Sequence, residues 1–543
     1  MEKFLRELLL KSAVRSLKLE ISSIEIEIPR EEGFGDLSTP LAMGLARILK
    51  KSPRKIAEEI TAGIEKGDVF EKIEIAGPGF INFTFSKKFL CDELRNLIKE
   101  HENFLIEDIG KGKKVQIEFV SANPTGPLHL GHGRGAALGA ALSNLLKEAG
   151  YDVEREYYIN DAGKQVRLLG ESVFARYKQL SGKDYPFPED GYRGEYIEDI
   201  AKEFKVKFKE NFAEKGFGEV SETFIDFSYK RMLDLIKHDL EDFGGIFDTW
   251  QSERELYEKG EVIQAIDDLK KRNCIYEKDG AVWFKSTAFG DDKDRVIIKN
   301  DGEYTYFASD IAYHRNKVEK GYDEIIDIWG ADHHGYIPRI QAVIKALGFP
   351  KESLRVLIVQ MVSLLKGGQP VQMSKRAGEF ITLREVIDEI GADTTKFLFL
   401  TRRSDSHLDV DIETAKAQSH ENPVFYVQYA HARINSIFEK AEVEMKDLID
   451  FNGELLNDEE IKIVKKLLLY PMIFKNAALA REPHRITFYL QELAGLFHPY
   501  YHRHRVISED TELTKARLAL CEAVMIVLKH GLKILGVKAP ERM

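Results

Sequence analysis

The sequence is poor in cysteine and has no long apolar run, and these two absences exclude several classes of protein. Its 543 residues include only three cysteines, which are widely separated (Cys91, Cys274 and Cys521). Such spacing forms neither a disulfide framework nor a zinc-ligand pair, and it favours a reducing compartment. The most apolar stretch, Val524–Val537, is interrupted by two lysines and a histidine and is too short to cross a membrane. We therefore expect a cytoplasmic protein with no membrane partner.

The sequence also lacks a net positive charge. Asp and Glu together number 90 and Lys and Arg 79, which gives a net charge of −11. A protein that coats nucleic acid without selectivity needs the opposite balance. The charge still permits a large enzyme with local basic surfaces, and the length predicts roughly three domains.

Hydrophobic periodicity divides the chain into three parts. Residues 1–108 combine helical patterns with a hairpin at a Gly-Pro-Gly turn, which predicts an α+β domain. Residues 109–415 alternate strands and helices, which is typical of a Rossmann-like parallel α/β domain, and they carry a largely helical insertion at about 170–280. Residues 416–543 are helical to the end and predict an all-α helical bundle. The expected fold is therefore multidomain.

One stretch in the middle part predicts a strand, a turn and a helix N-terminus in succession. The apolar run Val115–Val120 predicts a buried strand, and helical spacing begins at Gly133 after two prolines. Backbone N–H groups and the positive end of the helix dipole would meet there and favour a phosphate. His129 and His132 lie one helical turn apart at this position.

The residues of this stretch leave three interpretations open. The turn could serve packing alone, with both histidines exposed to solvent. It could bind a dinucleotide, because Gly131–Ala136 fits the pattern G-x-G-x-x-A and Asp152 and Glu154 follow about twenty residues later. It could also serve chemistry at the α-phosphate of a nucleotide, where imidazole donors stabilise the charge that grows on phosphorus.

A second polar stretch favours the third interpretation. Lys375 and Arg376 follow the glycine turn Gly367-Gly368 on a loop, far along the chain from the histidines. Taken alone, a Ser-Lys-Arg triplet is usually an exposed basic turn. Beside a nucleotide, however, it suits a movable clamp on the β- and γ-phosphates, which an enzyme that transfers hydride does not need.

Together the two stretches resemble the paired signatures HIGH and KMSKS of class I aminoacyl-tRNA synthetases. His129-Leu130-Gly131-His132 takes the place of the first, and Met373-Ser374-Lys375 lies within the second. The longer agreement is with the arginyl-tRNA synthetase family, and it extends over five segments: Gly33–Thr39, Glu118–Pro127, Tyr304–Asp310, Trp329–Gly335 and Leu535–Met543. The resemblance therefore covers essentially the whole chain.

The resemblance implies a ligase that attaches L-arginine to tRNA(Arg) through an arginyl-adenylate. It implies ATP as a substrate, Mg²⁺ as a cofactor, no zinc, and a monomer. The residues implied in ATP binding are His129, Gly131, His132, Asp332, His333, Met373, Ser374 and Lys375, of which His129, His132 and Lys375 would be catalytic. The HIGH region comprises Ala122, Asn123, Pro124, Thr125, Gly126, Pro127, Leu128, His129, Leu130, Gly131 and His132.

The same resemblance assigns an arginine pocket that is chemically reasonable. A guanidinium ion is a planar set of donors that is best held by carboxylates beside an aromatic ring. The resemblance implies that Tyr306 and Asp310 hold this group. It implies further that Ser121 and Asn123 place the backbone end of arginine and that Glu118 binds its α-amino group.

One position departs from the family pattern, because KMSKS begins with lysine and Gln372 stands there. How the leaving pyrophosphate is neutralised is thus open, and Lys366, six residues upstream, is a hypothetical substitute. The triplet Asp332-His333-His334 could instead bind a metal, but no further ligand is evident nearby in the sequence.

The last part of the chain interleaves basic and aromatic residues, a composition that suits single-stranded RNA. By resemblance to the family's anticodon-binding domain, the residues expected to contact tRNA are Tyr429, Arg433, Arg485, Tyr501 and Arg505. Residues 1–108 resemble the family's added N-terminal domain, which meets the tRNA elbow. Three alternatives remain: another class I synthetase, such as the cysteine enzyme, which would need cysteine and histidine zinc ligands that this sequence lacks; a non-catalytic tRNA-binding paralogue; and a dinucleotide-dependent oxidoreductase.

Overall fold

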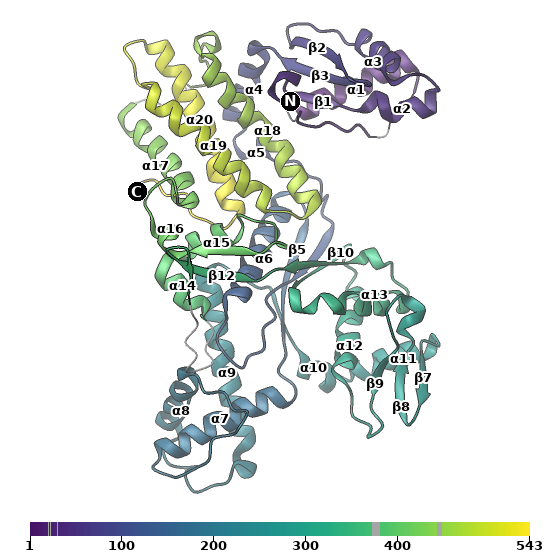
Figure 1. The fold of residues 1–543 in the computed structure, drawn as a ribbon, viewed down its shortest axis with the longest axis vertical. Helices are drawn as coiled ribbons and strands as arrows, with labels where there is room; N and C mark the ends of the chain where they lie inside the picture. The colour runs from purple at the N-terminus through teal and green to yellow at the C-terminus, as the bar shows by residue number, and fades with distance from the viewer. Residues whose placement is uncertain (20, 22, 30, 372–380, 442–447) are drawn as a thin grey trace.

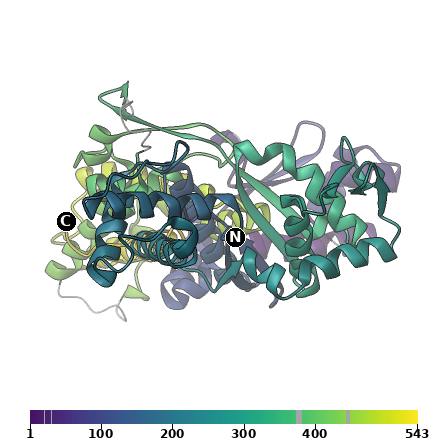
Figure 2. The same cartoon turned by 90° about the horizontal axis from the view of Figure 1, so that it is seen from below.

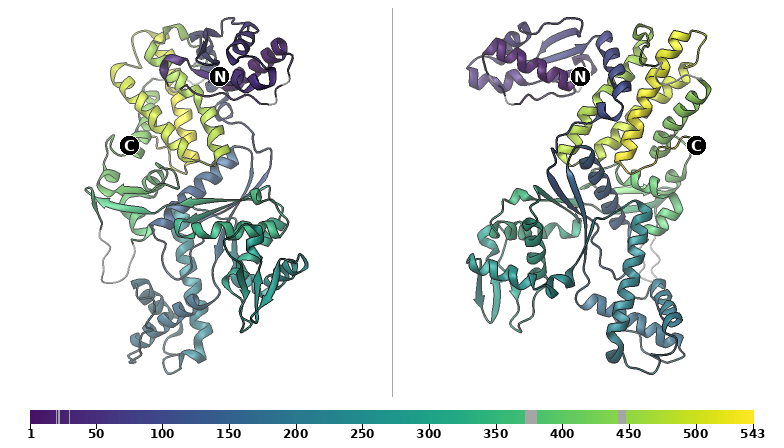
Figure 3. Two further views of the ribbon diagram at one scale, coloured as in Figure 1. Left: turned by 45° about the vertical axis from the view of Figure 1, so that its right-hand side comes forward. Right: turned by 180° about the vertical axis from the view of Figure 1, so that it is seen from behind.

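A computed structural model describes residues 1–543 except residues 20, 22, 30, 372–380 and 442–447 (Figure 1). The chain forms an elongated molecule with a parallel sheet at its middle. The N-terminal domain and the C-terminal helices lie on one side of this sheet, and two further lobes extend from its other side (Figures 1 and 3). Seen from below, the two lobes lie on opposite sides of the middle (Figure 2). The expected multidomain fold is confirmed.

The N-terminal domain has the predicted hairpin in a small antiparallel sheet. Its strands are β1 (Leu37–Thr39), β2 (Phe70–Ala76) and β3 (Phe80–Phe85), in the order β1-β3-β2. The accompanying helices are α1 (Glu2–Leu17), α2 (Leu41–Leu49) and α3 (Pro53–Ala62). Ile81, Phe83 and Phe85 are buried, which is the period-two pattern that predicted the strand.

The next helix, α4 (Lys87–Glu100), lies elsewhere than its sequence position suggests. With the short helix α5 (Glu102–Leu105), it packs mainly against the C-terminal helices α18 (Asp458–Ala480) and α20 (Thr511–Ile534) (Figure 1), and its first turn contacts the N-terminal sheet, where Phe89 stacks on Phe85. A helical pattern shows which face of a helix is apolar, but it does not show which neighbour covers that face.

The central sheet is parallel throughout and has the strand order β11-β10-β4-β5-β6. Its strands are β4 (Lys114–Glu118), β5 (Asp152–Ile159), β6 (Thr249–Ser252), β10 (Glu324–Gly330) and β11 (Leu354–Val359). The chain runs outward from β4 through β5 and β6, and it then returns to the other side of β4 for β10 and β11. At such a reversal, the carboxyl ends of the strands are where open α/β sheets bind ligands.

Helix α6 (Leu130–Glu148) follows β4 and packs closely against the sheet. Gly139 faces Phe119, and a Cβ atom at Gly139 would lie only 2.2 Å from Cγ of that ring. The small residues of α6 therefore permit the close approach of helix and strand. Arg134, which is buried on the same helix, donates hydrogen bonds to three backbone carbonyls of the segments that follow β11 and α15 (Ala392–Phe399).

Residues 170–280, where a largely helical insertion is expected, divide between two lobes with one strand of the central sheet between them. Helices α7 (Lys164–Leu180), α8 (Glu195–Phe208) and α9 (Phe217–Phe243) form one lobe, but the chain then returns to the central sheet as β6. A second lobe combines α10 (Glu253–Glu258), α11 (Glu261–Lys271), α12 (Tyr306–Glu319) and α13 (Ile337–Ala346) with the antiparallel strands β7 (Ile275–Lys278), β8 (Ala281–Phe284) and β9 (Arg295–Ile298). Strand β6 has four residues, three of them half-buried, so it contains no apolar run that the sequence could reveal.

The remaining elements connect the central sheet to the C-terminal bundle. Strand β12 (Val362–Lys366) pairs with β13 (Gln369–Pro370) and β14 (Leu408–Asp411), accompanied by α14 (Leu383–Ile390) and α16 (Ile412–Lys416). The bundle consists of α17 (Pro423–Ala441), α18, α19 (His484–Arg503) and α20. Short 3-10 helices are η1 (Glu32–Phe34), η2 (Ser286–Phe289), η3 (Ala331–Tyr336), η4 (Lys351–Ser353) and η6 (Gly453–Leu455). No helix in the described part of the chain is long and apolar enough to span a membrane.

Candidate active site

Strand β4 ends in a tight turn at the carboxyl edge of the sheet. Val120 and Ser121 have positive φ values, 70° and 41°, which are rare for residues with a side chain. The Ser121 hydroxyl donates to Oε1 of Glu118 at 2.8 Å and accepts from the N–H of Tyr158 at 3.1 Å. These bonds fasten the turn to β4 and β5, and such unfavourable backbone angles are typical of functional sites. Glu118 and Ser121, two of the predicted arginine-binding residues, are thus in direct contact.

His129 and His132 cap the first turn of α6 with their own rings. Nδ1 of His129 accepts from the N–H groups of Gly131 at 3.1 Å and His132 at 3.4 Å, and Nδ1 of His132 accepts from the N–H of His129 at 3.3 Å. The two rings are stacked, with their centroids 3.6 Å apart. Because each Nδ1 accepts a hydrogen bond, the proton of each neutral ring is on Nε2.

Both histidine rings are neutral at physiological pH. Burial lowers the pKa of His132 to about 3, and His129 acts in the same direction. Burial also lowers the pKa of His129, although Asp332 opposes this effect. Two neutral Nε2–H donors at a helix N-terminus can stabilise a phosphate, as the nucleotide interpretation requires.

The predicted nucleotide residues Asp332 and His333 lie on η3, directly after β10. Both side chains are exposed, and Nε2 of His333 is 3.4 Å from Oδ2 of Asp332. Strand β10 is the neighbour of β4, and the effect of Asp332 on the pKa of His129 shows that these two residues are close. The structure therefore places Asp332 near His129, as predicted for two residues of one nucleotide site.

The metal interpretation of Asp332-His333-His334 gains no support. Among the described residues, the group with the spacing of a metal site is Glu102, Glu148 and His530; Glu148 is the last residue of α6, at the opposite end of that helix from the nucleotide turn. The Lys533 ammonium already lies 2.9 Å from Glu102 and 2.8 Å from Glu148. A cation from the protein thus occupies the place that a metal ion would take.

The residues of the second signature, Gln372, Met373, Ser374 and Lys375, lie outside the described residues. The chain beyond them returns to the HIGH region, because Thr382 pairs with His129 in an isolated β-bridge. In addition, the N–H of Leu383 donates to the carbonyl of Leu128 at 2.7 Å. Lys366, the hypothetical substitute for the missing lysine, is exposed beside the β12–β13 turn.

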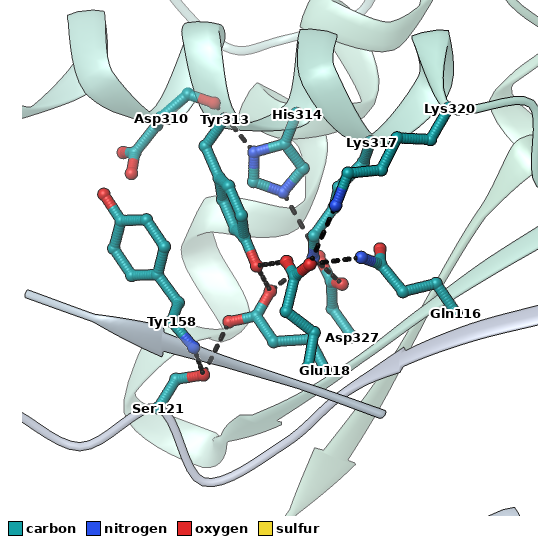
Figure 4. A network of polar contacts seen from close by, with 11 residues as sticks. Gln116, Glu118, Ser121, Tyr158, Asp310, Tyr313, His314, Lys317, Lys320 and Asp327 are labelled. Carbon is teal, nitrogen blue, oxygen red and sulfur yellow. Dashed lines mark hydrogen bonds and ion pairs between the residues drawn. The ribbon is translucent and has the colours of Figure 1, made fainter. Parts of the chain in front are cut away.

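A buried network of polar side chains joins strands β4, β5 and β10 to helix α12 (Figure 4). Oε2 of Glu118 accepts from the Tyr313 hydroxyl at 3.0 Å and is ion-paired with Lys317. The Lys317 ammonium lies 2.7 Å from Oδ1 of Asp327, and the Tyr313 hydroxyl also donates to Glu156. All five side chains are buried. Glu118 is therefore held from several directions.

Asp310 lies next to this network and faces Tyr158, whose hydroxyl points toward the Asp310 carboxylate (Figure 4). Asp310 is half-buried on α12. Burial raises the pKa of Asp310 to about 6, although His314 and Arg339 oppose the effect. The carboxylate is thus ionised at neutral pH and can bind a cation.

Glu253 supplies a further carboxylate that sequence reasoning missed. It is buried at the start of α10, and its Oε1 accepts from the Ser309 hydroxyl at 2.8 Å. Burial raises the pKa of Glu253 to about 7. The hydrogen bond from Ser309 opposes this effect, and the nearby Asp310 carboxylate adds to it. After burial, Glu253, Asp310 and Glu118 are the groups that most raise the pKa of Tyr158, so all three carboxylates lie near one ring.

The other predicted arginine-binding residues, Tyr306 and Asn123, are at the surface. Tyr306 begins α12 and is 63% exposed, which leaves its ring accessible to a ligand. Asn123 is exposed and donates to Oε1 of Gln165 at 2.8 Å. Between Asn123 and the histidines, the carbonyl of Thr125 accepts from the Tyr196 hydroxyl at 2.9 Å, which ties the HIGH region to the first lobe.

Most of the buried network was also missed, although the sequence carries a signal for it. Tyr313 and Lys317 lie on the same helical face as Asp310, at spacings of three and seven residues. Asp327 is a charged residue among the apolar residues of β10, and a buried charge requires a partner. Glu156 has no such signal, because β5 holds several other charged residues. Glu253 has no such signal, because it follows the short strand β6.

Three of the five predicted tRNA-binding residues form one cluster in the bundle. The Arg433 guanidinium lies 4.4 Å from the ring centre of Tyr429 and 4.5 Å from that of Tyr501. Arg505 follows Tyr501 closely and is exposed. Arg485 is at the opposite end of α19, roughly 24 Å from Tyr501 by the rise of the helix, and it is not part of the cluster.

Three family models match consecutive parts of the chain. The model described as the arginyl tRNA synthetase N terminal domain matches residues 4–85. The model of the class I (R) tRNA synthetase catalytic domain matches residues 93–438, and that of the DALR anticodon binding domain matches residues 427–543.

Whole-chain relatives agree with these matches. The chain is 50% identical over 529 residues to the arginine–tRNA ligase of Geobacter sp. (strain M21), with 96% of each chain covered. It is 46% identical over 584 aligned positions to that of Aquifex aeolicus, with both chains fully covered. Its fold matches Thermus thermophilus arginyl-tRNA synthetase with a TM-score of 0.77 over both whole chains, at 21% sequence identity. The chain belongs to the arginyl-tRNA synthetase family of class I.

Proposed function

We propose that the protein attaches L-arginine to tRNA(Arg) in two steps that consume ATP. The arginine carboxylate attacks the α-phosphate of ATP to give arginyl-adenylate and pyrophosphate. The arginyl group then passes to the terminal adenosine of the tRNA, which releases AMP. The observation that carries the proposal is that one edge of the sheet combines a histidine-capped helix N-terminus with a cluster of carboxylates. The first suits a phosphate and the second a guanidinium ion.

Catalysis in this proposal is positioning and electrostatic stabilisation. The Nε2–H groups of His129 and His132 donate to the α-phosphate as negative charge grows there. Asp332 and His333 border the adenylate, and Lys375 neutralises the leaving pyrophosphate. The exposed Asp332 carboxylate is an oxygen ligand of the kind that Mg²⁺ prefers, and Mg²⁺ would enter with ATP and neutralise phosphate charge.

Arginine is proposed to lie along α12, with its guanidinium group at Asp310 and its α-amino group at Glu118. The exposed ring of Tyr306 covers the guanidinium plane, and Glu253 adds negative charge. Ser121 and Asn123 orient the backbone end of the substrate. In this arrangement the substrate carboxylate is directed toward His129, where the two substrates meet.

The tRNA is proposed to bind across the C-terminal bundle and the N-terminal domain. Tyr429 and Tyr501 would stack on unpaired bases while Arg433 and Arg505 contact phosphates, as in other single-strand binding surfaces. Arg485, at the other end of α19, would contact a different part of the tRNA. We expect the protein to act as a monomer in the cytoplasm.

One assay tests the proposed function. The purified protein is incubated with ATP, total tRNA and each amino acid in turn, and both ATP–pyrophosphate exchange and charged tRNA are measured. Arginine alone is expected to support both reactions, and exchange is expected to require tRNA. Exchange with another amino acid, turnover of NAD(P)H, or no exchange at all would contradict the proposal.

The carboxylates of the pocket give the reaction a predictable pH dependence. The pKa of Asp310 is about 6 and that of Glu253 about 7, both raised by burial, so these groups take up protons as the pH falls. Protonation removes the charge that attracts the guanidinium group. We expect kcat/KM for arginine to fall by roughly tenfold per pH unit or more below about pH 6, and kcat/KM for ATP to change less. A kcat/KM for arginine that is flat or rises at low pH would contradict this prediction.

A further inference from the structure

The Lys317 ammonium is central to the buried network in Figure 4. Its side chain is 1% exposed, is ion-paired with Glu118 and lies 2.7 Å from Oδ1 of Asp327. Glu118 and Asp327 belong to neighbouring strands, β4 and β10, whereas Lys317 belongs to α12. One side chain thus links the helix that carries Asp310 to the strand end that carries Glu118.

The surroundings of Glu118 are rich in acids and poor in cations. The titratable groups that face it are Asp310, Tyr313 and Lys317 from α12, Asp327 from β10, and Glu156 and Tyr158 from β5. Two further groups affect Glu118 only through its neighbours: His314 is paired with Asp327, and Lys320 is paired with Glu156. Among the described residues, Lys317 is the one cation ion-paired with Glu118.

The charges of the network depend on this lysine. Burial raises the pKa of Glu118, and the neighbouring carboxylates of Asp327 and Glu156 raise it further. Lys317 exerts the largest opposing effect. Burial would lower the pKa of Lys317, but Asp327, Glu118 and Glu156 together raise it, so the lysine stays charged. Without the ammonium, Lys320 would remain at Glu156 and His314 at Asp327, but Glu118 would have no cation paired with it among the described residues. The pKa of Glu118 would then rise further, because Lys317 would no longer oppose the effect of burial.

We propose that Lys317 is a positioning residue for the amino-acid substrate: it keeps Glu118 ionised and fixed in place, so that Glu118 presents a permanent negative charge to the α-ammonium group of arginine. The proposal rests on the proposed function, in which Glu118 binds that group. Lys317 itself does not reach the substrate, because its ammonium is buried between Glu118 and Asp327. The consequence is that the guanidinium and α-amino subsites are coupled through α12.

The test compares Lys317→Met with the wild type in aminoacylation between about pH 6.5 and about pH 8.5. At neutral pH the variant is expected to raise KM for arginine by roughly tenfold to a hundredfold, with KM for ATP within about twofold of the wild type. The ratio of the two enzymes' KM values for arginine should fall as the pH rises, because Glu118 loses its proton. A ratio near one, or a raised ratio that does not change with pH, would overturn the proposal.

Arg315→Met is the matched control on the same helix. Arg315 is 14% exposed and pairs with Asp268 and Glu319 on the opposite side of α12 from the site, at 2.8 Å and 3.0 Å. Its replacement removes a comparable ion pair and should leave KM for arginine within about twofold at every pH. An equal, pH-dependent rise in both variants would show a general loss of structure and overturn the specific role of Lys317.

If Lys317→Met does not fold, Tyr313→Phe is the alternative variant that tests whether Glu118 must be held in place. It removes only the hydroxyl that donates to Glu118 at 3.0 Å and to Glu156, and it keeps the ring. KM for arginine should rise by roughly threefold to tenfold, more at low pH than at high pH. An unchanged KM would overturn the proposal.

Glu118→Gln separates this proposal from the proposed function. The amide cannot titrate, so the variant should raise KM for arginine by a factor that does not depend on pH. If Glu118→Gln leaves KM unchanged, Glu118 does not bind arginine and both proposals fail. If Glu118→Gln raises KM but Lys317→Met does not, only the role of Lys317 fails.

Discussion

Asp310→Asn is expected to raise KM for arginine by roughly a hundredfold to a thousandfold while KM for ATP stays within about twofold. The substitution keeps the shape of the side chain and removes its charge. In the half-buried pocket beside Tyr158, a charge-assisted pair with the guanidinium group is stronger than it would be in water. Steady-state aminoacylation at varied arginine and varied ATP measures both constants.

Glu319→Gln is the control for this prediction. Glu319 ends the same helix, is 48% exposed and pairs with Arg315 at 3.0 Å. Its replacement should change neither constant by more than about twofold, because an exposed ion pair contributes little. An Asp310→Asn variant with a wild-type KM for arginine would show that the guanidinium group binds elsewhere. Equal rises in both KM values would show instead that the variant has lost the structure of the site.

His129→Asn is expected to lower kcat by roughly a hundredfold to a thousandfold with little change in either KM. Asparagine is a good N-cap, so its side-chain oxygen can accept the bonds that Nδ1 of His129 now accepts from Gly131 and His132. The variant therefore keeps the helix start and lacks the Nε2–H donor. Pre-steady-state measurement of arginyl-adenylate formation, together with the thermal midpoint, separates the two effects.

His129→Ala is the companion variant, because it removes the cap as well as the donor. It should lose roughly 1 kcal/mol of stability in addition to the same loss of rate. If His129→Asn instead retains most of the wild-type rate, the ring serves only to cap α6 and the proposed role at the α-phosphate is wrong.

How far the sequence predicts this structure depends on the range of each interaction. The strand, turn and helix around His129 follow from local patterns, and the structure has them in that order, although β4 ends at Glu118 rather than Val120 and α6 begins at Leu130 rather than Gly133. Strand β6 has no apolar run of its own, and the residues that cover it are distant in the sequence. Helix α4 is covered by helices that come several hundred residues later. Such placements depend on tertiary contacts that local periodicity does not contain.

The candidate site shows the same division. The family resemblance supplied the side chains expected at the substrates, and the structure places Glu118 in contact with Ser121 and near Asp310. It did not supply the groups behind them, such as Lys317 and Glu253. Those side chains can be recognised only from the tertiary packing of α12, because their partners belong to other elements. Lys317 pairs with carboxylates of β4 and β10, and Glu253 accepts a hydrogen bond from Ser309 of α12. The spacing of Arg485 from Tyr501 likewise separates two residues that the composition had grouped together.

A crystal structure with L-arginine bound is the most direct test of the arginine site. The guanidinium group should lie within hydrogen-bond distance of the Asp310 carboxylate, with the Tyr306 ring against its plane. The α-ammonium group should face Glu118, and the substrate carboxylate should point toward His129. Arginine bound in the reverse direction, or outside the space between Asp310 and Glu118, would contradict the proposed function and the role of Lys317 together.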